Sequence, residues 1–259
     1  MARRGLIKSS QEVEWLRQAG RIHKEVLTKL VDLTEPGITT KKIDRVAREM
    51  IADLGGTCPF LGYQGFQGAV CLSVNQELVH GIPGNKIVHS GDILKLDLGV
   101  AFNGMIVDGA TTIVVDTTKK DLSSDIVRLM TGTRAALVRM SEFLKPGISN
   151  HQISLEISKI LRKYKLYPAK NLTGHGVGYQ VHENPTIPNY LDLSLPEVKL
   201  PAGAVVAIEP IASLGTKDNY LAKDGWTYIT ADQSLSAHYE DTILITEDGC
   251  EFITRSYQV

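Results

Sequence analysis

The sequence has few cysteines, no excess of charge of one sign and no long apolar run. Its three cysteines, Cys58, Cys71 and Cys250, are too few and too irregularly spaced for a disulfide framework or a thiolate metal site, and they suit a reducing compartment. Lys and Arg number 28 against 29 Asp and Glu, so the net charge of −1 supplies no basic field for nucleic acid. No apolar run approaches the roughly 20 residues of a membrane helix, and the basic start lacks the apolar stretch of a signal peptide. We therefore expect a cytoplasmic protein without a membrane segment.

The composition is otherwise that of an ordinary globular protein, with 43% hydrophobic and 22% charged residues. These proportions exclude collagen, a coiled coil and a disordered tail. At 259 residues the chain is near the size at which one hydrophobic core stops growing. We expect residues 1–259 to form a single domain.

Two helices are predicted near the start of the chain. Ser9 and Glu12 have the spacing of a capping box, and apolar residues then recur at helical intervals, which predicts a helix over about residues 10–31. A second helix is predicted to begin from a cap at Thr39 or Thr40. The stretch over residues 55–68 is rich in glycine and aromatic residues and predicts a loop.

Two short patterns recur in the second half of the sequence. The segment PGIT at 36–39 reappears about 110 residues later as PGIS at 146–149, and the apolar segment 91–97 is echoed by 203–209. Both copies of the apolar segment end in a carboxylate. Short matches also arise by chance, but two at nearly the same offset favour a pseudo-symmetric α+β domain with a site between its halves.

The clearest local geometry is a predicted hairpin that carries two aspartates. Asn103-Gly104 is the preferred dipeptide of a two-residue type I′ turn. The pairing that follows from this turn puts Asp97 and Asp108 on one face as diagonal neighbours, within reach of a single ion or a pair of ions. Two carboxylates this close resist joint ionisation unless a cation or a shared proton intervenes. Taken alone, the pair is equally typical of surface aspartates beside an ordinary hairpin.

Three further side chains are candidates for the same site. His175 lies in the segment GHGVG at 174–178, where glycines leave the imidazole unobstructed, although an isolated histidine is more often structural. Glu209 ends an apolar strand, where a carboxylate is unusual unless it is paired or binds a metal. Glu240 lies near the start of a predicted strand and, in isolation, is typical of a solvent-facing residue. Together, four carboxylates and one imidazole suit Mn, Fe, Co or Zn at a catalytic site, and the set fits two ions better than one.

Five motifs in order resemble the type I methionine aminopeptidases, enzymes of the pita-bread fold. They are His80-Gly81-Ile82-Pro83, the hairpin of Asp97 and Asp108, the segment 174–178, Ile208-Glu209-Pro210 and the segment SLSAHYE at 234–240. The resemblance covers nearly the whole chain. No long helical insertion separates the motifs, which argues against the type II enzymes. The resemblance implies an α+β pita-bread (creatinase/aminopeptidase-like) fold with two pseudo-symmetric halves, an antiparallel sheet and outer helices, as one catalytic domain over residues 1–259.

The resemblance also implies roles for these residues. Two divalent ions, Co, Mn, Fe or Zn, would bind Asp97, Asp108, His175, Glu209 and Glu240. His80 and His182 would contact the substrate, and His182 would stabilise the carbonyl of the scissile bond. Glu209 would also pass a proton towards the leaving amine. The implied reaction is attack of a metal-activated hydroxide on the first peptide bond, which removes the N-terminal methionine of a nascent protein and favours a small second residue.

The resemblance further implies a pocket for the methionine side chain. Its matching positions are Phe60, Tyr63, Phe66, Cys71, Val181 and Trp226. Phe60 stands where the family often has cysteine, and Val181 stands where phenylalanine is usual. These look like compensating size changes, larger on one wall and smaller on the other, so they affect the shape of the pocket and not the chemistry.

The family suggests a monomer that works in the cytoplasm on nascent polypeptide N-termini, near the exit tunnel of the ribosome. Arg3, Arg4 and Lys8 either help such docking or form a solvated tail. Prolidases and Xaa-Pro aminopeptidases share the fold and the ligand set, but they usually carry a further N-terminal domain, whereas about 90 residues precede Asp97 here. A binding module without metal is the other alternative. It would be expected to lack at least one of the ligands or substrate-contacting histidines, and all seven are present.

Overall fold

A central antiparallel sheet organises the computed structural model, which describes residues 6–116 and 122–258. The strands of this sheet, in spatial order, are β1 (Val70–Val74), β3 (Ile93–Phe102), β4 (Met105–Val114), β13 (Glu240–Ile245), β8 (Val205–Ile208), β6 (Thr173–Gly176) and β7 (Glu183–Pro188), with β14 (Cys250–Phe252) beside β13. Every pairing in it is antiparallel. The α+β class with an antiparallel sheet is therefore confirmed.

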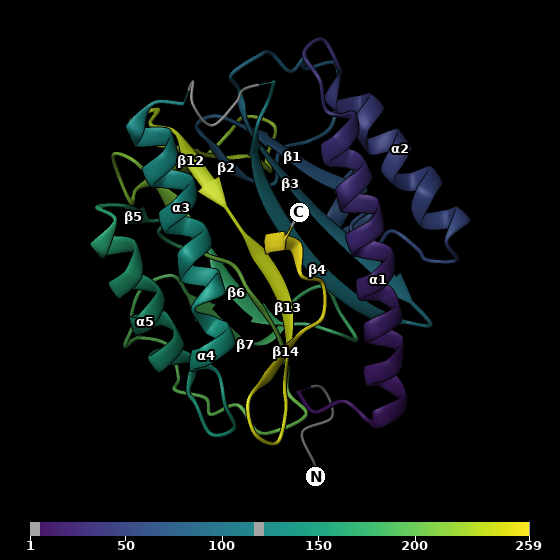
Figure 1. Ribbon diagram of the computed structural model, residues 1–259, viewed down its shortest axis with the longest axis vertical. Coiled ribbons are helices and arrows are strands. Elements are labelled where there is room, and N and C mark those ends of the chain that lie inside the picture. The colour runs from purple at the N-terminus through teal and green to yellow at the C-terminus, as the bar shows by residue number, and fades with distance from the viewer. Residues whose placement is uncertain (1–5, 117–121, 259) are drawn as a thin grey trace.

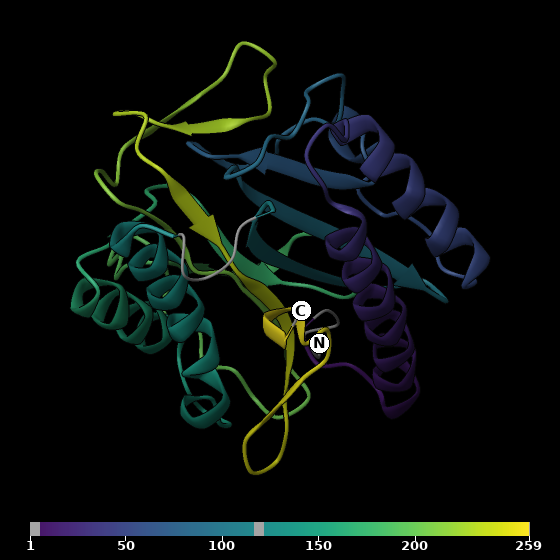
Figure 2. The same ribbon diagram turned by 45° about the horizontal axis from the view of Figure 1, so that its top comes forward.

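Helices cover the two halves of this sheet (Figure 1). The helices are α1 (Ser10–Leu33), α2 (Thr40–Asp53), α3 (Ser124–Val138), α4 (Met140–Phe143) and α5 (Asn150–Lys163), with single 3-10 turns at η1 (Tyr63–Gly65) and η2 (Ser256–Gln258). Helices α1 and α2 lie on the side of β3 and β4, whereas α3, α4 and α5 lie together on the other side (Figure 2). Among the helices described, none has both the length and the apolar character that crossing a membrane requires.

Two small sheets complete the architecture. One joins β10 (Asn219–Leu221), β11 (Tyr228–Thr230) and β2 (Glu77–Val79), and the other joins β12 (Ser236–His238), β9 (Ile211–Ser213) and β5 (Tyr167–Pro168). The first of these sheets joins β2 of the first half to β10 and β11 of the C-terminal third, whereas the second sheet lies wholly within the second half of the chain.

The predicted helix starts are confirmed by their caps. The Ser9 backbone N–H donates to Glu12 Oε2 at 2.7 Å, and Ser9 Oγ accepts from the Glu12 N–H at 3.3 Å, which is the reciprocal capping box. Helix α1 continues two residues beyond the predicted end, to Leu33. Helix α2 begins behind an N-cap at Thr39, whose side chain accepts from the Lys42 N–H.

The repeated sequence patterns occupy equivalent places in the two halves. The Gly37 N–H donates to the Val88 carbonyl at 2.8 Å, and the Gly147 N–H donates to the Leu200 carbonyl at the same distance. Each glycine is followed two residues later by the N-cap of a helix, α2 or α5. The echo in the sequence is thus a structural repeat, as the prediction of two similar halves requires.

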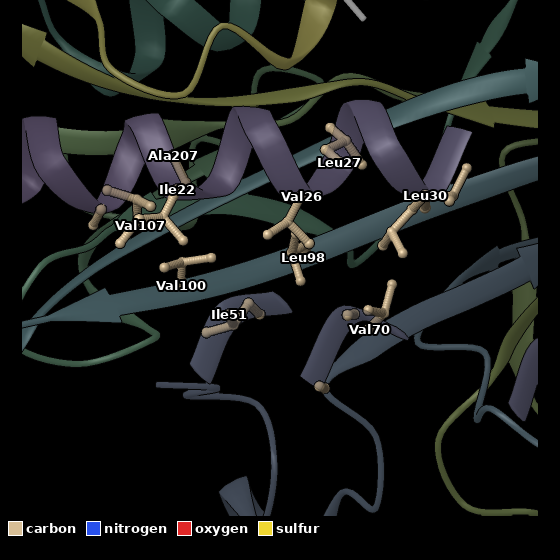
Figure 3. Packing of buried hydrophobic residues seen from close by; sticks show 14 of the residues in the cluster. Ile22, Val26, Leu27, Leu30, Ile51, Val70, Leu98, Val100, Val107 and Ala207 are labelled. Carbon is tan, nitrogen blue, oxygen red and sulfur yellow. The ribbon is translucent and has the colours of Figure 1, made fainter. Parts of the chain in front are cut away.

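Two large clusters of buried apolar side chains form the core, one mainly in each half. In the first, Ile22, Val26 and Leu30 of α1 point towards Leu98 and Val100 of β3 (Figure 3). The second core gathers apolar side chains of α3, α4 and α5 against β8 and β13. Strands of the central sheet contribute side chains to both cores, and these strands carry Asp97, Asp108 and Glu240 of the candidate site.

The hairpin of β3 and β4 has the predicted turn and register. Asn103 and Gly104 have φ values of 48° and 79°, as a type I′ turn requires, and Phe102 pairs with Met105. In this register Asp108 lies opposite Gly99, two residues from Asp97. Both aspartates are buried, so the alternative of surface aspartates is excluded.

Asp44 of α2 anchors the segment that leads into β1. Its Oδ1 accepts hydrogen bonds from the N–H groups of Ala69 and Val70 at 2.6 and 3.2 Å, and its Oδ2 accepts one from Arg48 at 2.7 Å. The loop that contains Phe60 and Phe66 ends at this anchor, so Asp44 connects the stability of α2 to the position of that loop.

We expect Asp44→Ala to lower the free energy of unfolding by about 2–4 kcal/mol, because two buried N–H groups lose their acceptor. Urea unfolding followed by circular dichroism measures this change. Asp53→Ala, at an exposed position on the same helix, is the control and should change stability by about 0.5 kcal/mol or less. Equal effects of the two substitutions would contradict the anchoring role.

Candidate active site

The candidate site lies where the two halves of the central sheet meet at β13. This strand pairs with β4 of the first half through Glu240 and Asp241, and with β8 of the second half from Asp241 onwards. Strand β4 carries Asp108, and Glu209 directly follows β8. The pairing of β13 with both strands therefore brings carboxylates from both halves to one place.

All thirteen site residues predicted from the sequence line a single cavity. They are Phe60, Tyr63, Phe66, Cys71, His80, Asp97, Asp108, His175, Val181, His182, Glu209, Trp226 and Glu240. One wall of the cavity is acidic and the other is apolar and aromatic. A wider surface groove shares His80, His175, His182 and Glu209 with this cavity, so these four side chains lie at the junction of the two.

The acidic wall contains two groups of possible metal ligands. The first group is Asp108, His175 and Glu240, and the second is Asp97, His238 and Glu240; within each group the ligand atoms lie within 4.8 Å of one another. Glu240 belongs to both groups, so it is suited to bridge two ions. His238 was not among the residues that we predicted from the sequence.

Burial and mutual repulsion oppose the ionisation of these acids. Burial raises the pKa of Asp97, and burial together with the neighbouring carboxylates raises the pKa values of Asp108, Glu209 and Glu240 well above their usual range. One oxygen each of Asp97, Asp108 and Glu240 is buried without a hydrogen-bond partner in the part of the chain that the structure describes. Divalent cations would satisfy these oxygens and offset the repulsion, so the residues present fit a metal centre.

His175 has the geometry of a metal ligand that is oriented from behind. Its Nδ1 lies 2.9 Å from the carbonyl oxygen of Gly176, which can only accept a hydrogen bond, so Nδ1 carries the proton and the lone pair of Nε2 is available. Nε2 faces Glu209 Oε1 at 3.6 Å. Burial lowers the pKa of His175 to about 3, which keeps the ring neutral at pH 7.

The other two predicted histidines stand at the opening of the cavity. His182 Nδ1 lies 3.0 Å from the hydroxyl of Tyr63, and its ring centroid is 4.4 Å from that of His175. His80 has a positive φ of 60°, and its ring meets the ring of Tyr228 edge to face at 5.9 Å. Burial lowers the pKa values of both histidines, that of His80 to about 4, so both rings are neutral hydrogen-bonding groups at pH 7.

The apolar wall is a compact cluster. Phe60, Phe66, Cys71 and Val181 are buried together, and Tyr63 and Trp226 pack against them. The ring of Phe66 meets that of Trp226 at 5.1 Å between centroids. A Cβ atom at Gly99 would lie 2.7 Å from the ring of Phe60, so the glycine makes room for this large side chain.

The sequence did contain a signal for His238. Residues two apart in an extended strand share a face, and His238 is two residues before Glu240. The predicted motif SLSAHYE therefore carried both side chains, but only the carboxylate was assigned. Burial lowers the pKa of His238 to about 4.

Comparison with known proteins gives consistent relatives. The model of metallopeptidase family M24 matches residues 14–247. Methionine aminopeptidase 1 of Bacillus subtilis is 37% identical over 250 residues, which cover 96% of this chain and 99% of the relative. The methionine aminopeptidase of Escherichia coli is 34% identical over 250 residues, covering 96% of this chain and 93% of the relative.

Solved structures agree with these sequences. The crystal structure of a methionine aminopeptidase from Thermotoga maritima superposes with a TM-score of 0.91 at 35% identity, over 96% of this chain and 99% of that one. A prolidase from Pyrococcus furiosus superposes with a TM-score of 0.73 at 22% identity, over 96% of this chain but 65% of the prolidase. The second likeness shows the fold alone, and together with the curled sheet it confirms the pita-bread fold.

Proposed function

We propose that this chain, which belongs to metallopeptidase family M24, removes the N-terminal methionine of polypeptides by metal-dependent hydrolysis. One observation carries this proposal: a single cavity joins an acidic centre suited to divalent ions to an apolar pocket lined by Phe60, Phe66 and Trp226. An apolar pocket beside the reacting centre suits one unbranched apolar side chain at the end of a peptide.

Asp97, Asp108, His175, Glu209 and Glu240 would hold two divalent ions, and this donor set accepts Co, Mn, Fe or Zn. When bound, such ions lower the pKa of water and polarise a carbonyl group, which is the chemistry that hydrolysis of an amide needs. The substrate enters with its methionine side chain in the apolar pocket, and the rest of the peptide leaves through the wider groove that adjoins the cavity.

The protein's own side chains then position the peptide and move the proton. Glu209 lines both the cavity and the groove, so its carboxylate can take a proton from the attacking water and deliver it to the leaving amine. His182, oriented by the Tyr63 hydroxyl, stabilises the developing charge on the carbonyl oxygen. His80 contacts the peptide beyond the scissile bond.

We expect Glu209→Gln to lower kcat by at least about 10²-fold, because an amide cannot accept and return the proton. Steady-state release of methionine from Met-Ala-Ser measures this. His182→Gln is the comparison, since it keeps a hydrogen-bond donor towards the carbonyl and should retain more activity. A Glu209→Gln enzyme with wild-type kcat would show that the proton takes another route.

We expect Val181→Phe to raise the KM for Met-Ala-Ser by about tenfold or more, because the added ring overfills a pocket that already contains Phe60. Adding Phe60→Cys in the same protein should restore KM, since the volume gained on one wall is then removed from the other. The double-mutant cycle tests the compensation directly. Independent, additive effects of the two substitutions would contradict it.

The finer assignments follow from the same proposal. Residues 1–259 act as one catalytic domain, a monomer that works in the cytoplasm on nascent polypeptides with a small second residue, near the ribosomal exit tunnel. Arg3 and Arg4 lie outside the described residues. Lys8 is buried and pairs with Glu183 at 2.9 Å, so it is not part of a solvated tail or a docking surface.

Cleavage of matched peptides tests the function. Metal-free protein and protein loaded with Mn²⁺ or Co²⁺ are incubated with Met-Ala-Ser, Met-Lys-Ser and Ala-Pro, and free amino acids are measured. Release of methionine from Met-Ala-Ser alone, and only with metal, is the expected result. Cleavage of Ala-Pro instead would indicate a prolidase specificity, and no cleavage with any metal would indicate a binding role.

A further inference from the structure

We propose that His238 is a sixth metal-binding side chain of this site and gives the ion between Asp97 and Glu240 an imidazole ligand of its own. The inference rests on the proposed function, whose metal centre is predicted from the sequence to have five ligands. With His175 alone, the two ions would share one imidazole ligand. With His238 added, each ion would have an imidazole ligand.

The geometry of the acidic wall supports this assignment. Each of the two ligand groups contains one aspartate, one histidine and the shared Glu240. His238 Nε2 lies 3.5 Å from Glu240 Oε2 and 3.7 Å from Glu209 Oε2, while His175 Nε2 lies 3.6 Å from Glu209 Oε1. Each of the two imidazoles therefore faces a different oxygen of the Glu209 carboxylate. Such separations suit ligands of one ion with bonds of about 2.0–2.2 Å.

The ring of His238 is buried without a hydrogen bond to the described residues, although two carboxylates face its Nε2. His238 is 1% exposed, and neither of its ring nitrogens has a hydrogen-bond partner among residues 6–116 and 122–258. His23, which is equally buried, directs Nε2 to the carbonyl of Gly109 at 3.1 Å, and His175 directs Nδ1 to a carbonyl. A buried imidazole without a partner is costly, and a bond from Nε2 to a metal ion would remove part of that cost.

The backbone holds the ring towards the centre. The His238 N–H donates to Thr112 Oγ1 at 2.9 Å, and the same hydroxyl donates to the His238 carbonyl at 2.6 Å. Thr112 belongs to β4, the strand that also carries Asp108. The position of His238 is therefore fixed relative to a neighbouring ligand, as a metal ligand requires.

The competing role is a purely orienting one, in which His238 hydrogen-bonds to Glu209 or Glu240 without touching the metal. Loss of activity on substitution would not separate the two roles. A direct observation of the bond between metal and ring nitrogen does.

Nuclear magnetic resonance of cadmium-113 provides that observation. The full chain, labelled with nitrogen-15 in its histidines, is freed of metal and loaded with two equivalents of cadmium-113. We expect two cadmium resonances, each coupled to one histidine nitrogen. In His238→Phe, which keeps a ring of similar size, one resonance should lose its coupling and shift, and calorimetry with Co²⁺ should show one of the two ions bound about 10–100-fold more weakly.

The controls separate folding, ligation and the metal centre itself. His238→Gln is a smaller polar replacement for use if the phenylalanine variant does not fold, and His89→Gln, at an exposed position, should change neither resonance. Two cadmium ions with only one histidine coupling in the wild type would overturn the inference and leave the proposed function intact. Failure of the wild type to bind any cadmium or cobalt would overturn the proposed metal centre, and this inference with it.

Discussion

Replacing Glu240 by glutamine should abolish the binding of both metal ions and lower kcat/KM for Met-Ala-Ser by about 10³-fold or more. Glu240 is the only described residue common to both groups of possible ligands, so its loss affects both ions, whereas loss of Asp97 affects one group. A neutral amide supplies a weaker oxygen donor and removes one of the negative charges that attract the cations. Calorimetric titration with Co²⁺ and peptide hydrolysis measure the two effects.

The same substitution should make the metal-free protein more stable, by about 1–3 kcal/mol. In the absence of cations, Glu240 is buried beside Asp97 and Asp108, and an isosteric amide removes that repulsion. Differential scanning calorimetry in the presence of a chelator tests this, with Glu247→Gln, exposed beyond the end of β13, as the control. A variant that retains two ions, or that melts below the wild type without metal, would contradict the assigned role of Glu240.

The site could be predicted from the sequence where local rules determine the geometry. The Asn103-Gly104 turn fixes the register of a hairpin, and the register then fixes which aspartates share a face. The family motifs supplied the positions of the remaining residues, and the structure brought all of them to one cavity. Chain connectivity alone would not have shown that β13 lies between β4 and β8.

The residues that were missed depend on contacts distant in sequence. Lys8 was assigned either to ribosome docking or to a solvated tail, yet it pairs with Glu183, and its ammonium group lies 4.2 Å from the ring centroid of Tyr179. His238 and Glu240 belong to different strands in different sheets, so their shared direction depends on how the chain passes from β12 to β13. The pairing of Lys8 leaves no periodic signal in the sequence, whereas the two-residue spacing of His238 and Glu240 is a signal that only the structure turns into an assignment.

Removal of the metal from the wild-type protein should abolish peptide hydrolysis and lower the melting temperature. An ion present at one hundred times its dissociation constant stabilises the folded state by about 2.7 kcal/mol. For a chain of this size that corresponds to a decrease of about 5–10 °C for each ion removed. Calorimetry before and after dialysis against a chelator measures the change, and re-addition of Mn²⁺ or Co²⁺ should reverse it. If the chelator did not change the melting temperature, the protein would not contain the proposed metal centre.

The stabilisation of the folded protein by metal should also increase with pH, because two effects act in the same direction. In the metal-free protein the pKa values of Asp97, Asp108, Glu209 and Glu240 are raised, so above about pH 4 the unfolded chain loses protons that the folded chain retains. Its stability therefore falls as pH rises from about 4 towards the folded-state pKa values. Metal ions bind the deprotonated ligands, so their affinity rises over the same range.

Melting curves between pH 5 and 8 test this dependence. The difference in melting temperature between the metal-loaded and metal-free proteins should widen as the pH rises. The metal-free Glu240→Gln variant should lose less stability over this range, because one of the interacting carboxyl groups is absent. If the difference in melting temperature between metal-loaded and metal-free wild type stayed constant with pH, these acids would not bind the ions.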